Sequence, residues 1–325
     1  MSNEQKLRKV EAKSQKLPMR SILMNVTILL FSVVLLLLGS VFIIGYNALN
    51  SIEHEDDNIE EVEDDEDDDY LLSNSSVLNI AIFGSDSRGQ DRGRSDTSLI
   101  LSVNKDEEMI KITSLLRDIW VSIPEYGSDR LNAAYSYGGA KLAVKTIQKN
   151  FGIKIDRYII LDFDSFKTII DKLGGIDINL TEDEVKFINL FSPNEPQIEK
   201  AGLVHLNGDQ ALSYARDRKS SGSDFDRTKR QRIVMKNIFD KLKDANVMKI
   251  INVITDVCPA IKTNFSNSEI TKLARNVMVF LKYDIGEYRV PEDGNFSNES
   301  IDGKSVLVIN NKKKALDNLS KFIYG

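Results

Sequence analysis

Three short apolar runs, separated by charged breaks, constrain the fold of this 325-residue chain more than any other feature. Residues 78–83, 97–103 and 109–116 are rich in Ile, Leu and Val, a composition typical of strands that are buried on both faces of a sheet. Strand ends hold reactive side chains at fixed separations, so we predict an active site at the breaks. The charged residues of these breaks are Asp86, Arg88, Arg94, Asp96, Arg117 and Asp118.

Beyond the third run the chain alternates strand-like and helix-like segments, which indicates an α/β fold. Residues 181–207 contain two prolines and are predicted to form a loop, and no internal repeat or second domain is evident. Further strands are predicted at 119–123, 157–163, 176–180, 285–290 and 305–309. Helices are predicted at 140–151, 164–173, 208–218, 227–242, 248–257, 268–281 and 312–323.

The N-terminal part is predicted to anchor the chain in a membrane. Residues 22–45 are 24 residues without a charge, enough to cross a bilayer as a helix, and too long for the apolar part of a cleaved signal peptide. The preceding segment is basic, which places it in the cytoplasm and the rest of the chain outside. We therefore expect a cytoplasmic tail at 1–21, a transmembrane helix at 22–46, an acidic extracellular linker at 47–75 and a catalytic domain at 76–325.

Charge is distributed unevenly along the chain. The formal net charge of -6 includes thirteen acidic residues at 53–69, a segment that we expect to be an extended tether. The globular part is mildly basic, which suits an anionic ligand without requiring nucleic acid. One cysteine and two histidines exclude a Cys/His zinc site, and the sequence has neither a P-loop nor a G-x-S-x-G elbow. Any metal would therefore bind oxygen ligands.

A second charged group lies between two predicted helices. Arg216 and Arg218 are near the end of one helix, and Arg227 is at the start of the next, where free backbone N–H groups also attract anions. Guanidinium groups bind phosphate oxygens in pairs, so six arginines at such positions predict a ligand with several anionic oxygens. Asp86 and Asp96 have the character of Mg²⁺ ligands, although each residue taken alone is better explained as a surface ion pair.

Taken together, these segments resemble the LytR-CpsA-Psr (LCP) family of bacterial cell-wall glycopolymer ligases. The resemblance spans about residues 78–235, and the family's single N-terminal membrane helix also matches. It implies one domain with a central mixed sheet flanked by helices. The segments that carry it are NIAIFGSDSR, GRSDTSLILSVN, LLRDIWVSIPEYG, LNAAYSYGGAKLAV, DFDSFKTIIDKLGGIDI, HLNGDQALSYARDRK and DFDRTKRQR.

The resemblance implies an activity and assigns roles to residues. Members of the family transfer a glycan with one phosphate from undecaprenyl diphosphate to a peptidoglycan hydroxyl, commonly the C6 hydroxyl of N-acetylmuramic acid, and undecaprenyl phosphate leaves. Asp86 and Asp96 resemble the ligands of Mg²⁺, with Mn²⁺ as the alternative ion. Asp224 resembles a pocket carboxylate that acts as a base or orients an arginine, and Arg117 is the second catalytic candidate. The residues that resemble diphosphate contacts are Arg94, Arg117, Arg216, Arg218, Arg227 and Gln231, with Arg88 in addition.

Three positions depart from the family pattern. Leu116 stands where proline is frequent, and Asp226 where glycine is common. Asp217 stands between two arginines where an uncharged residue is usual, and we expect it to pair with one of them and weaken the grip on phosphate. The lipid tail is expected to occupy an apolar slot between the sheet and the helices at 140–151 and 164–173.

Two other functions fit the same residues. With water as the nucleophile, the site would be that of a polyprenyl-diphosphate pyrophosphatase. A non-catalytic regulatory or lipid-binding protein is the third hypothesis, because the basic residues 227–232 could suggest DNA. The predicted topology argues against nucleic acid, since it places this cluster outside the cell.

Overall fold

The computed structural model describes residues 47, 50–55, 74–85, 95–220 and 224–325. The chain divides into two compact units, Met1–Asn47 and Ala48–Gly325, and almost all of the described residues belong to the second. The predicted membrane segment lies outside the described residues. Within them, no helix has the length and apolar character needed to cross a bilayer.

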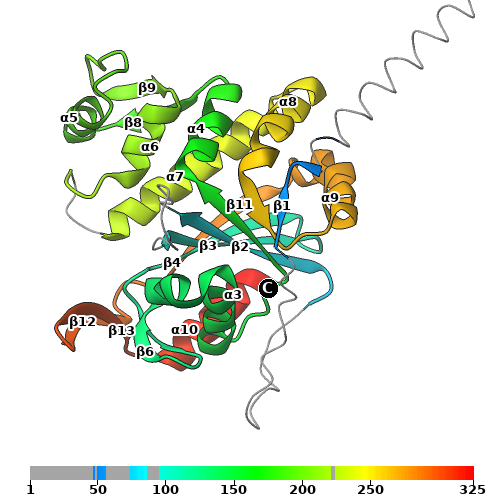
Figure 1. Ribbon diagram of the computed structural model, residues 1–325. Helices are drawn as coiled ribbons and strands as arrows, with labels where there is room; N and C mark the ends of the chain where they lie inside the picture. Colours follow the sequence, from blue (N-terminus) through cyan, green and yellow to red (C-terminus); the bar gives the residue numbers. More distant parts are fainter. Residues whose placement is uncertain (1–46, 48–49, 56–73, 86–94, 221–223) are drawn as a thin grey trace, which may run out of the picture. The chain divides into compact units, whose positions relative to one another are not determined.

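A seven-stranded mixed sheet forms the centre of the second unit, in the order β1-β10-β7-β2-β3-β4-β11 (Figure 1). The middle of the sheet is the antiparallel meander β2–β3–β4, which the three apolar runs predicted. Strands β7 and β11 add in parallel to β2 and β4, which makes the sheet mixed as expected. The strands are β1 (Glu53–His54), β2 (Val77–Ser85), β3 (Ser95–Asn104), β4 (Met109–Leu115), β7 (Arg157–Asp162), β10 (Ile261–Thr263) and β11 (Asp284–Val290).

Alternate side chains of the central strands enter two separate cores, because successive residues of a strand point to opposite faces. Phe83 and Ile100 pack toward α3 (Leu131–Phe151) and α10 (Lys312–Tyr324) on one face. Ile82, Leu99 and their neighbours pack toward α7 (Asp224–Lys243) and α9 (Asn267–Phe280) on the other. Figure 1 shows the two helical layers on either side of the sheet. Each such side chain contributes roughly 1.5–3 kcal/mol when it is fully buried.

A further core lies beyond the α7 layer. It joins α4 (Phe163–Lys172), α6 (Gly208–Arg216) and α8 (Val247–Val257) to the hairpin of β8 (Ile176–Leu180) and β9 (Gly202–Leu206). Smaller elements complete the unit: the hairpins β5 (Trp120–Ile123) with β6 (Gly127–Arg130) and β12 (Phe296–Ile301) with β13 (Lys304–Ile309), and the short helix η2 (Cys258–Ala260).

The predicted loop at 181–207 was wrong, because this segment contains α5 (Glu182–Phe191) as well as β9. The signal for α5 was present in the sequence. Thr181 caps the helix, its side chain accepts from the Glu184 N–H, and the Glu184 carboxylate accepts from the Thr181 N–H, which is a capping box. Helix α3 begins at Leu131, but Gly138 and Gly139 have non-helical torsions, and the helix predicted from 140 is the part of α3 that follows this kink.

The predicted tether was also wrong for its first described residues. Glu53–His54 form strand β1, which pairs in parallel with β10 at the edge of the sheet. Ile52 is buried against Cys258 and Ile270, and the Tyr158 hydroxyl donates to Glu55 at 2.6 Å. The acidic residues 56–69 lie outside the described residues, but they follow β1 in the chain and therefore connect two strands of one sheet.

Candidate active site

The ends of three central strands meet at one end of the sheet, as the charged breaks predicted. Ser85 at the end of β2 pairs with Ser95 at the start of β3, and Ser98 pairs with Leu115 at the end of β4. Asp96 belongs to β3 at this end, and its side chain is outside the description. Asp86, Arg88 and Arg94 lie outside the described residues, so their predicted roles stay predictions.

A cluster of charges, here called the open cluster, consists of Arg117 after β4 and Asp224 and Arg227 in the first turn of α7. The Asp224 Oδ1 atom lies 2.9 Å from Arg227 Nη2 and 3.4 Å from Arg117 Nε. Arg227 is 2% exposed, so its charge is held in a site with little water. The structure therefore brings Arg117 together with two residues that lie more than 100 positions further along the chain.

Asp224 has the properties of a proton acceptor. Burial raises the pKa of its carboxyl group above the usual range, although the nearby Arg227 and Arg117 act in the opposite direction. Within the described part of the chain, neither carboxylate oxygen accepts a hydrogen bond of normal geometry. A buried carboxylate in this state keeps its oxygens available for a hydroxyl donor.

An apolar pocket, here called the slot, lies further along α7 and is lined by Gln231, one helical turn after Arg227. Its walls are side chains of β2, β3, α4 and α7, including Ile82, Leu99, Phe166 and Met235. Arg216 and Gln231 also line it and give it a polar side. We expected such a slot between the sheet and the helices at 140–151 and 164–173. The second helix is α4 and does line the slot, but the first is part of α3, which covers the opposite face of the sheet.

Two of the residues predicted to contact the diphosphate, Arg216 and Gln231, are held in place at this slot by other side chains. The guanidinium carbon of Arg216 lies 4.5 Å from the centre of the Phe163 ring, a cation–π contact that holds an exposed arginine in place. Gln231 donates from Nε2 to the Thr97 hydroxyl at 2.9 Å, which ties α7 to the residue after Asp96. Arg218 is exposed, and its charge lowers the pKa of Asp224, which places it near the open cluster.

Asp217 does not pair with its neighbours Arg216 and Arg218, so that prediction was wrong. Its side chain turns inward, is fully buried, and accepts from the backbone N–H groups of Lys219 and Ser220 at 2.8 and 3.1 Å. The chain changes direction at this point, because α6 ends at Arg216 and Asp217 has an extended backbone. Asp217 therefore does not neutralise either of the two arginines.

A buried arginine that the sequence did not single out holds this turn. Arg230 donates from Nη1 to the Asp217 carbonyl oxygen at 3.0 Å, and from Nε to Glu184 of α5 at 2.8 Å. We call Glu184, Arg230 and Asp217 the closed cluster, since all three are buried. Arg230 entered the prediction only as part of the segment DFDRTKRQR, and its partner Glu184 lay in the predicted loop.

Leu116, the departure from proline, has a structural role. It is fully buried, and its N–H group donates to the Val290 carbonyl oxygen at 3.0 Å. Proline has no N–H group and could not make this bond. The bond attaches the segment that carries Arg117 to the end of β11.

Comparison with known proteins gives consistent matches. The LytR_cpsA_psr family model matches residues 40–321. The polyisoprenyl-teichoic acid–peptidoglycan teichoic acid transferase TagU of Bacillus mycoides (strain KBAB4) is 33% identical over 233 residues, which are 71% of this chain and 74% of TagU. TagT of B. subtilis, solved bound to LIIa-WTA, has a TM-score of 0.65 at 24% identity and covers 77% of this chain and 90% of TagT. TagT has also been solved with octaprenyl pyrophosphate lipid, with a TM-score of 0.60 at 21% identity, covering 77% of this chain and 91% of TagT.

Proposed function

The chain belongs to the LytR-CpsA-Psr family, and on that premise we propose that it is a phosphotransferase of cell-wall assembly. It moves a glycopolymer with one phosphate from undecaprenyl diphosphate to a hydroxyl of peptidoglycan, for which we take the C6 hydroxyl of N-acetylmuramic acid. One observation carries the proposal: an apolar slot has Arg216 and Gln231 on its polar side, and Gln231 lies one turn of α7 after Arg227 of the arginine–carboxylate cluster. The relative TagU is named for a transfer of this type.

The site supplies the two requirements of phosphoryl transfer, which are neutralised charge and fixed positions. The lipid tail enters the slot, and Arg216 and Gln231 bind the phosphate nearest the lipid. Arg117 and Arg227 then neutralise the phosphate that carries the glycan. Arg218, Arg94 and Arg88 are proposed as further contacts to the diphosphate.

Asp224 is the proposed general base. The oxygen of the acceptor hydroxyl forms a bond to the phosphorus that carries the glycan, while its proton passes to the Asp224 carboxylate. The bond from that phosphorus to the bridging oxygen breaks, and undecaprenyl phosphate leaves with this oxygen. No covalent intermediate with the protein is needed, because the arginines stabilise the charge that develops.

The carboxylates of Asp86 and Asp96 are proposed to hold Mg²⁺, or Mn²⁺ in its place. The strand register fits this, since Ser85 and Ser95 are paired and each is followed directly by one of the two aspartates. Carboxylate oxygens are the ligands that these ions prefer. When bound, the ion would neutralise charge on the diphosphate oxygens.

We also propose that residues 22–46 anchor the chain in the cell membrane, with the N-terminus in the cytoplasm and the catalytic domain outside. The basic segment before the apolar run supports this orientation. It places the site on the side where lipid-linked glycan and peptidoglycan meet, and away from nucleic acid.

The test uses the full chain in lipid nanodiscs and a glycan linked to undecaprenyl diphosphate. Release of undecaprenyl phosphate is measured with Mg²⁺ or EDTA, and with or without a peptidoglycan oligomer. We expect release that requires both the ion and the oligomer. Release without the oligomer would support the pyrophosphatase, and no release under any condition would support a regulatory or lipid-binding protein.

A further inference from the structure

Helix α9 lies on the sheet without burying any of its side chains fully. Ile270 and Leu273 pack on the sheet and are half-buried. The opposite side of the helix presents Met278 and Val279, which are 45% and 50% exposed. Apolar side chains in these positions are unusual for a helix face that meets only water, because an amphipathic helix normally places polar residues there.

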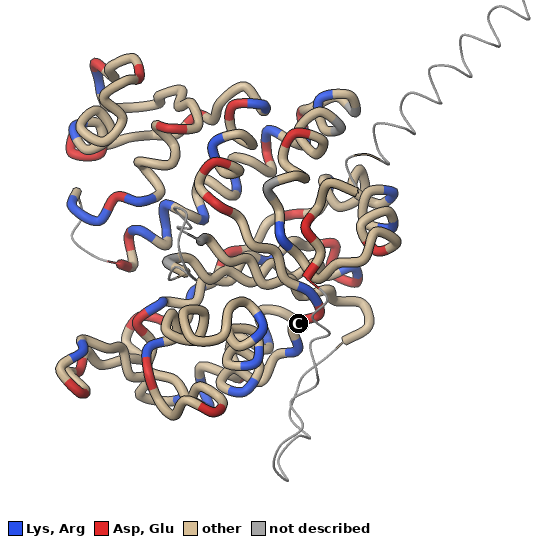
Figure 2. The backbone as a smooth tube through the Cα atoms, viewed as in Figure 1, with Lys and Arg blue, Asp and Glu red and all other residues tan. Residues whose placement is uncertain are grey.

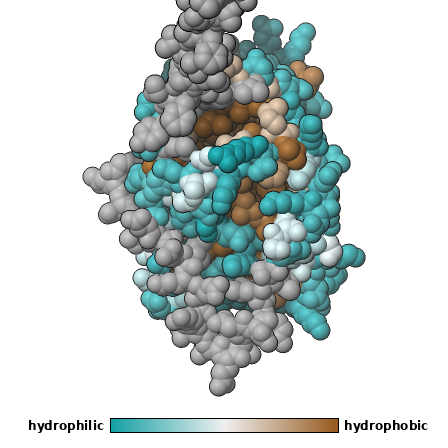
Figure 3. Space-filling model, turned by 90° about the vertical axis from the view of Figure 1, so that its right-hand side faces the viewer, coloured by the Kyte–Doolittle hydropathy of each residue, from teal (hydrophilic) through white to brown (hydrophobic). Residues whose placement is uncertain are grey.

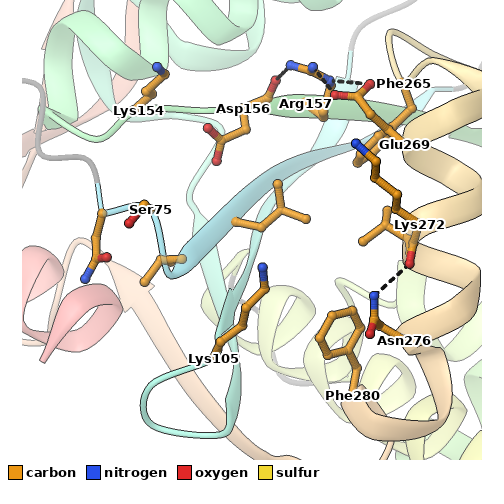
Figure 4. Close-up of a pocket in the computed structure, with 14 residues that line it drawn as sticks. Ser75, Lys105, Lys154, Asp156, Arg157, Phe265, Glu269, Lys272, Asn276 and Phe280 are labelled. Atoms are coloured by element: carbon orange, nitrogen blue, oxygen red, sulfur yellow. Dashed lines mark hydrogen bonds and ion pairs between the residues drawn. The ribbon is translucent and has the colours of Figure 1, made fainter.

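A pocket of about 710 Å³ lies between α9 and the starts of β2 and β7, at the end of the sheet opposite the active site. Its floor is apolar, with Leu78, Leu273 and Phe280. Lys105 and Lys272 extend from opposite sides of it, as Figure 4 shows. The pocket is therefore amphipathic, with an apolar floor under a rim that carries more basic than acidic side chains.

The basic residues at this pocket and along α9 exceed the acidic ones that could neutralise them. Arg157 and Glu269 neutralise each other, since Arg157 donates to the Glu269 carboxylate through two nitrogens. Asp156 also lines the pocket and accepts from the Asn79 N–H group at 2.8 Å.

 Glu269 is thus paired with Arg157, and Asp156 interacts electrostatically with Lys154 and Arg157. Within the described part of the chain, no ion pair is made by the side chains of Lys105, Lys272, Arg275 and Lys282.

We call the surface formed by this pocket and the outer side of α9 the α9 face. Figure 2 shows basic residues on α9 together with acidic ones. Figure 3, which looks onto the side of the molecule where α8, α9 and β1 lie, shows apolar surface gathered in a hollow with polar side chains around it. The residues that define the α9 face are Lys105, Lys272, Arg275, Met278, Val279 and Lys282.

The chain before β1 limits how far this surface can lie from a membrane. Ile52 is buried against Ile270 of α9 and against Cys258. The proposed span ends at residue 46, so six peptide steps connect it to Ile52, and an extended chain of that length reaches roughly 20 Å. The limit rests on the proposed anchor and holds whichever reaction the enzyme catalyses.

We propose that the α9 face docks on the headgroups of an anionic lipid bilayer, and that the pocket takes one lipid phosphate between Lys105 and Lys272. The exposed Met278 and Val279 then meet the boundary between headgroups and acyl chains, as the apolar side of an interfacial helix does. The apolar pocket floor accommodates the part of the lipid next to its phosphate. Each basic residue near an anionic surface strengthens such binding by about five-fold.

The test uses the full chain in nanodiscs, with an environment-sensitive fluorophore on one introduced cysteine. V279C places it on the α9 face, and L203C is the matched control, because Leu203 is 78% exposed on β9. The native Cys258 is buried and burial raises its thiol pKa to about 11, so it does not compete for the label. With phosphatidylglycerol discs we expect a blue-shifted emission at position 279 that lipid-borne quenchers reduce, and neither effect at position 203. Equal emission and equal quenching at the two positions would overturn the proposal.

Charge reversal tests the choice of ligand. In labelled V279C, the pair K105E and K272E is expected to abolish the blue shift, whereas K312E and K313E on α10 leave it unchanged. A shift that survives the first pair, or that is equal in phosphatidylcholine discs, would contradict binding to anionic headgroups. A shift that requires two chains in one disc would assign the face to a second copy instead. The readout involves no turnover, so it fails or succeeds independently of the transfer reaction, and loss of the chain from all discs would identify a failure of the anchor.

Discussion

Two clusters of buried charge lie within two turns of each other on α7, and they differ in how completely they are bonded. In the closed cluster, Arg230 donates to Glu184 and to the Asp217 carbonyl, and Asp217 accepts from two backbone N–H groups. In the open cluster, Asp224 is close to two arginines, but neither of its oxygens accepts a hydrogen bond of normal geometry in the described part of the chain.

The difference separates a structural role from a chemical one. In the closed cluster one Asp217 oxygen accepts two hydrogen bonds and only the other has no hydrogen-bond partner among the described residues, whereas both Asp224 oxygens lack one. Buried charges that are hydrogen-bonded fix the conformation around them, here the turn that presents Arg216 and Arg218. A buried carboxylate without such bonds costs folding free energy, which is expected where its oxygens are needed by a substrate. The following variants test this distinction, in order of decreasing effect.

The largest effect is expected from D224N, which keeps the shape of the side chain and removes its ability to accept the acceptor's proton. We expect transfer to fall by about 10²–10⁴-fold, the usual contribution of a general base. The folded state should not lose stability at neutral pH, because burial disfavours the charged carboxylate that is being removed. Turnover and thermal unfolding of the same preparation measure both quantities.

D240N is the matched control, since Asp240 is an exposed residue of the same helix. It should leave both turnover and unfolding unchanged. Wild-type turnover in D224N would remove the base from the mechanism.

R230M should differ from D224N, because its main effect should be a loss of stability of the folded state. It leaves Glu184 and Asp217 buried without their cation, and breaking a buried pair in this way costs about 3–5 kcal/mol. Urea unfolding measures the loss. A variant that unfolds like wild type but has lost turnover would show that Arg230 acts in the chemistry and that the two clusters do not differ as described.

R117K tests whether the open cluster needs a guanidinium or only a charge. Lysine cannot bind a phosphate through two parallel donors, so we expect turnover to fall by roughly 10²-fold while the fold is kept. R130K is a suitable control, because Arg130 contacts Asp118 from the adjacent β6 and lies outside the predicted diphosphate contacts. Equal turnover of R117K and wild type would count against the role of Arg117.

The smallest effect is expected from pH. Transfer needs ionised Asp224, and burial raises the pKa of that carboxyl group, so turnover should fall with decreasing pH at a higher pH than for an ordinary aspartate. The free energy of unfolding should depend on pH in the opposite direction to turnover. A raised pKa of Asp224 stabilises the folded state at low pH, and this contribution is lost as the pH rises through the pKa of the folded protein. A pH–rate profile whose acid limb lies at or below pH 3.8, the ordinary value, would contradict the assignment.

Much of the fold followed from local patterns. The central meander was predictable because uninterrupted runs of Ile, Leu and Val specify buried strands, and β8 was predicted with its observed bounds, Ile176–Leu180. Strands β1 and β10 were not, since they have two and three residues and depend on pairing between segments more than 200 positions apart. Helix α5 was missed although its capping box is visible in the sequence, because two nearby prolines favoured a loop.

The sequence predicted which residues form the site, but not the directions in which all of their side chains point. Arg117, Asp224 and Arg227 were expected together from their family-like motifs, and the structure places them within contact distance. The inward turn of Asp217 could not be read from its neighbours, because it depends on Arg230 and on a helix at 182–191 that had not been predicted. The slot was assigned one wrong wall for a similar reason: periodicity shows that a helix is amphipathic, but not which face of the sheet it covers.

The most direct test of the proposed reaction follows the phosphate that carries the glycan. The full chain in nanodiscs is given a donor with radioactive phosphorus at that position, together with a peptidoglycan oligomer. The proposed reaction predicts that the label appears in glycan-modified peptidoglycan and that the released lipid is unlabelled undecaprenyl phosphate. Label recovered on the glycan without peptidoglycan, or as inorganic phosphate, would contradict transfer to peptidoglycan and indicate hydrolysis.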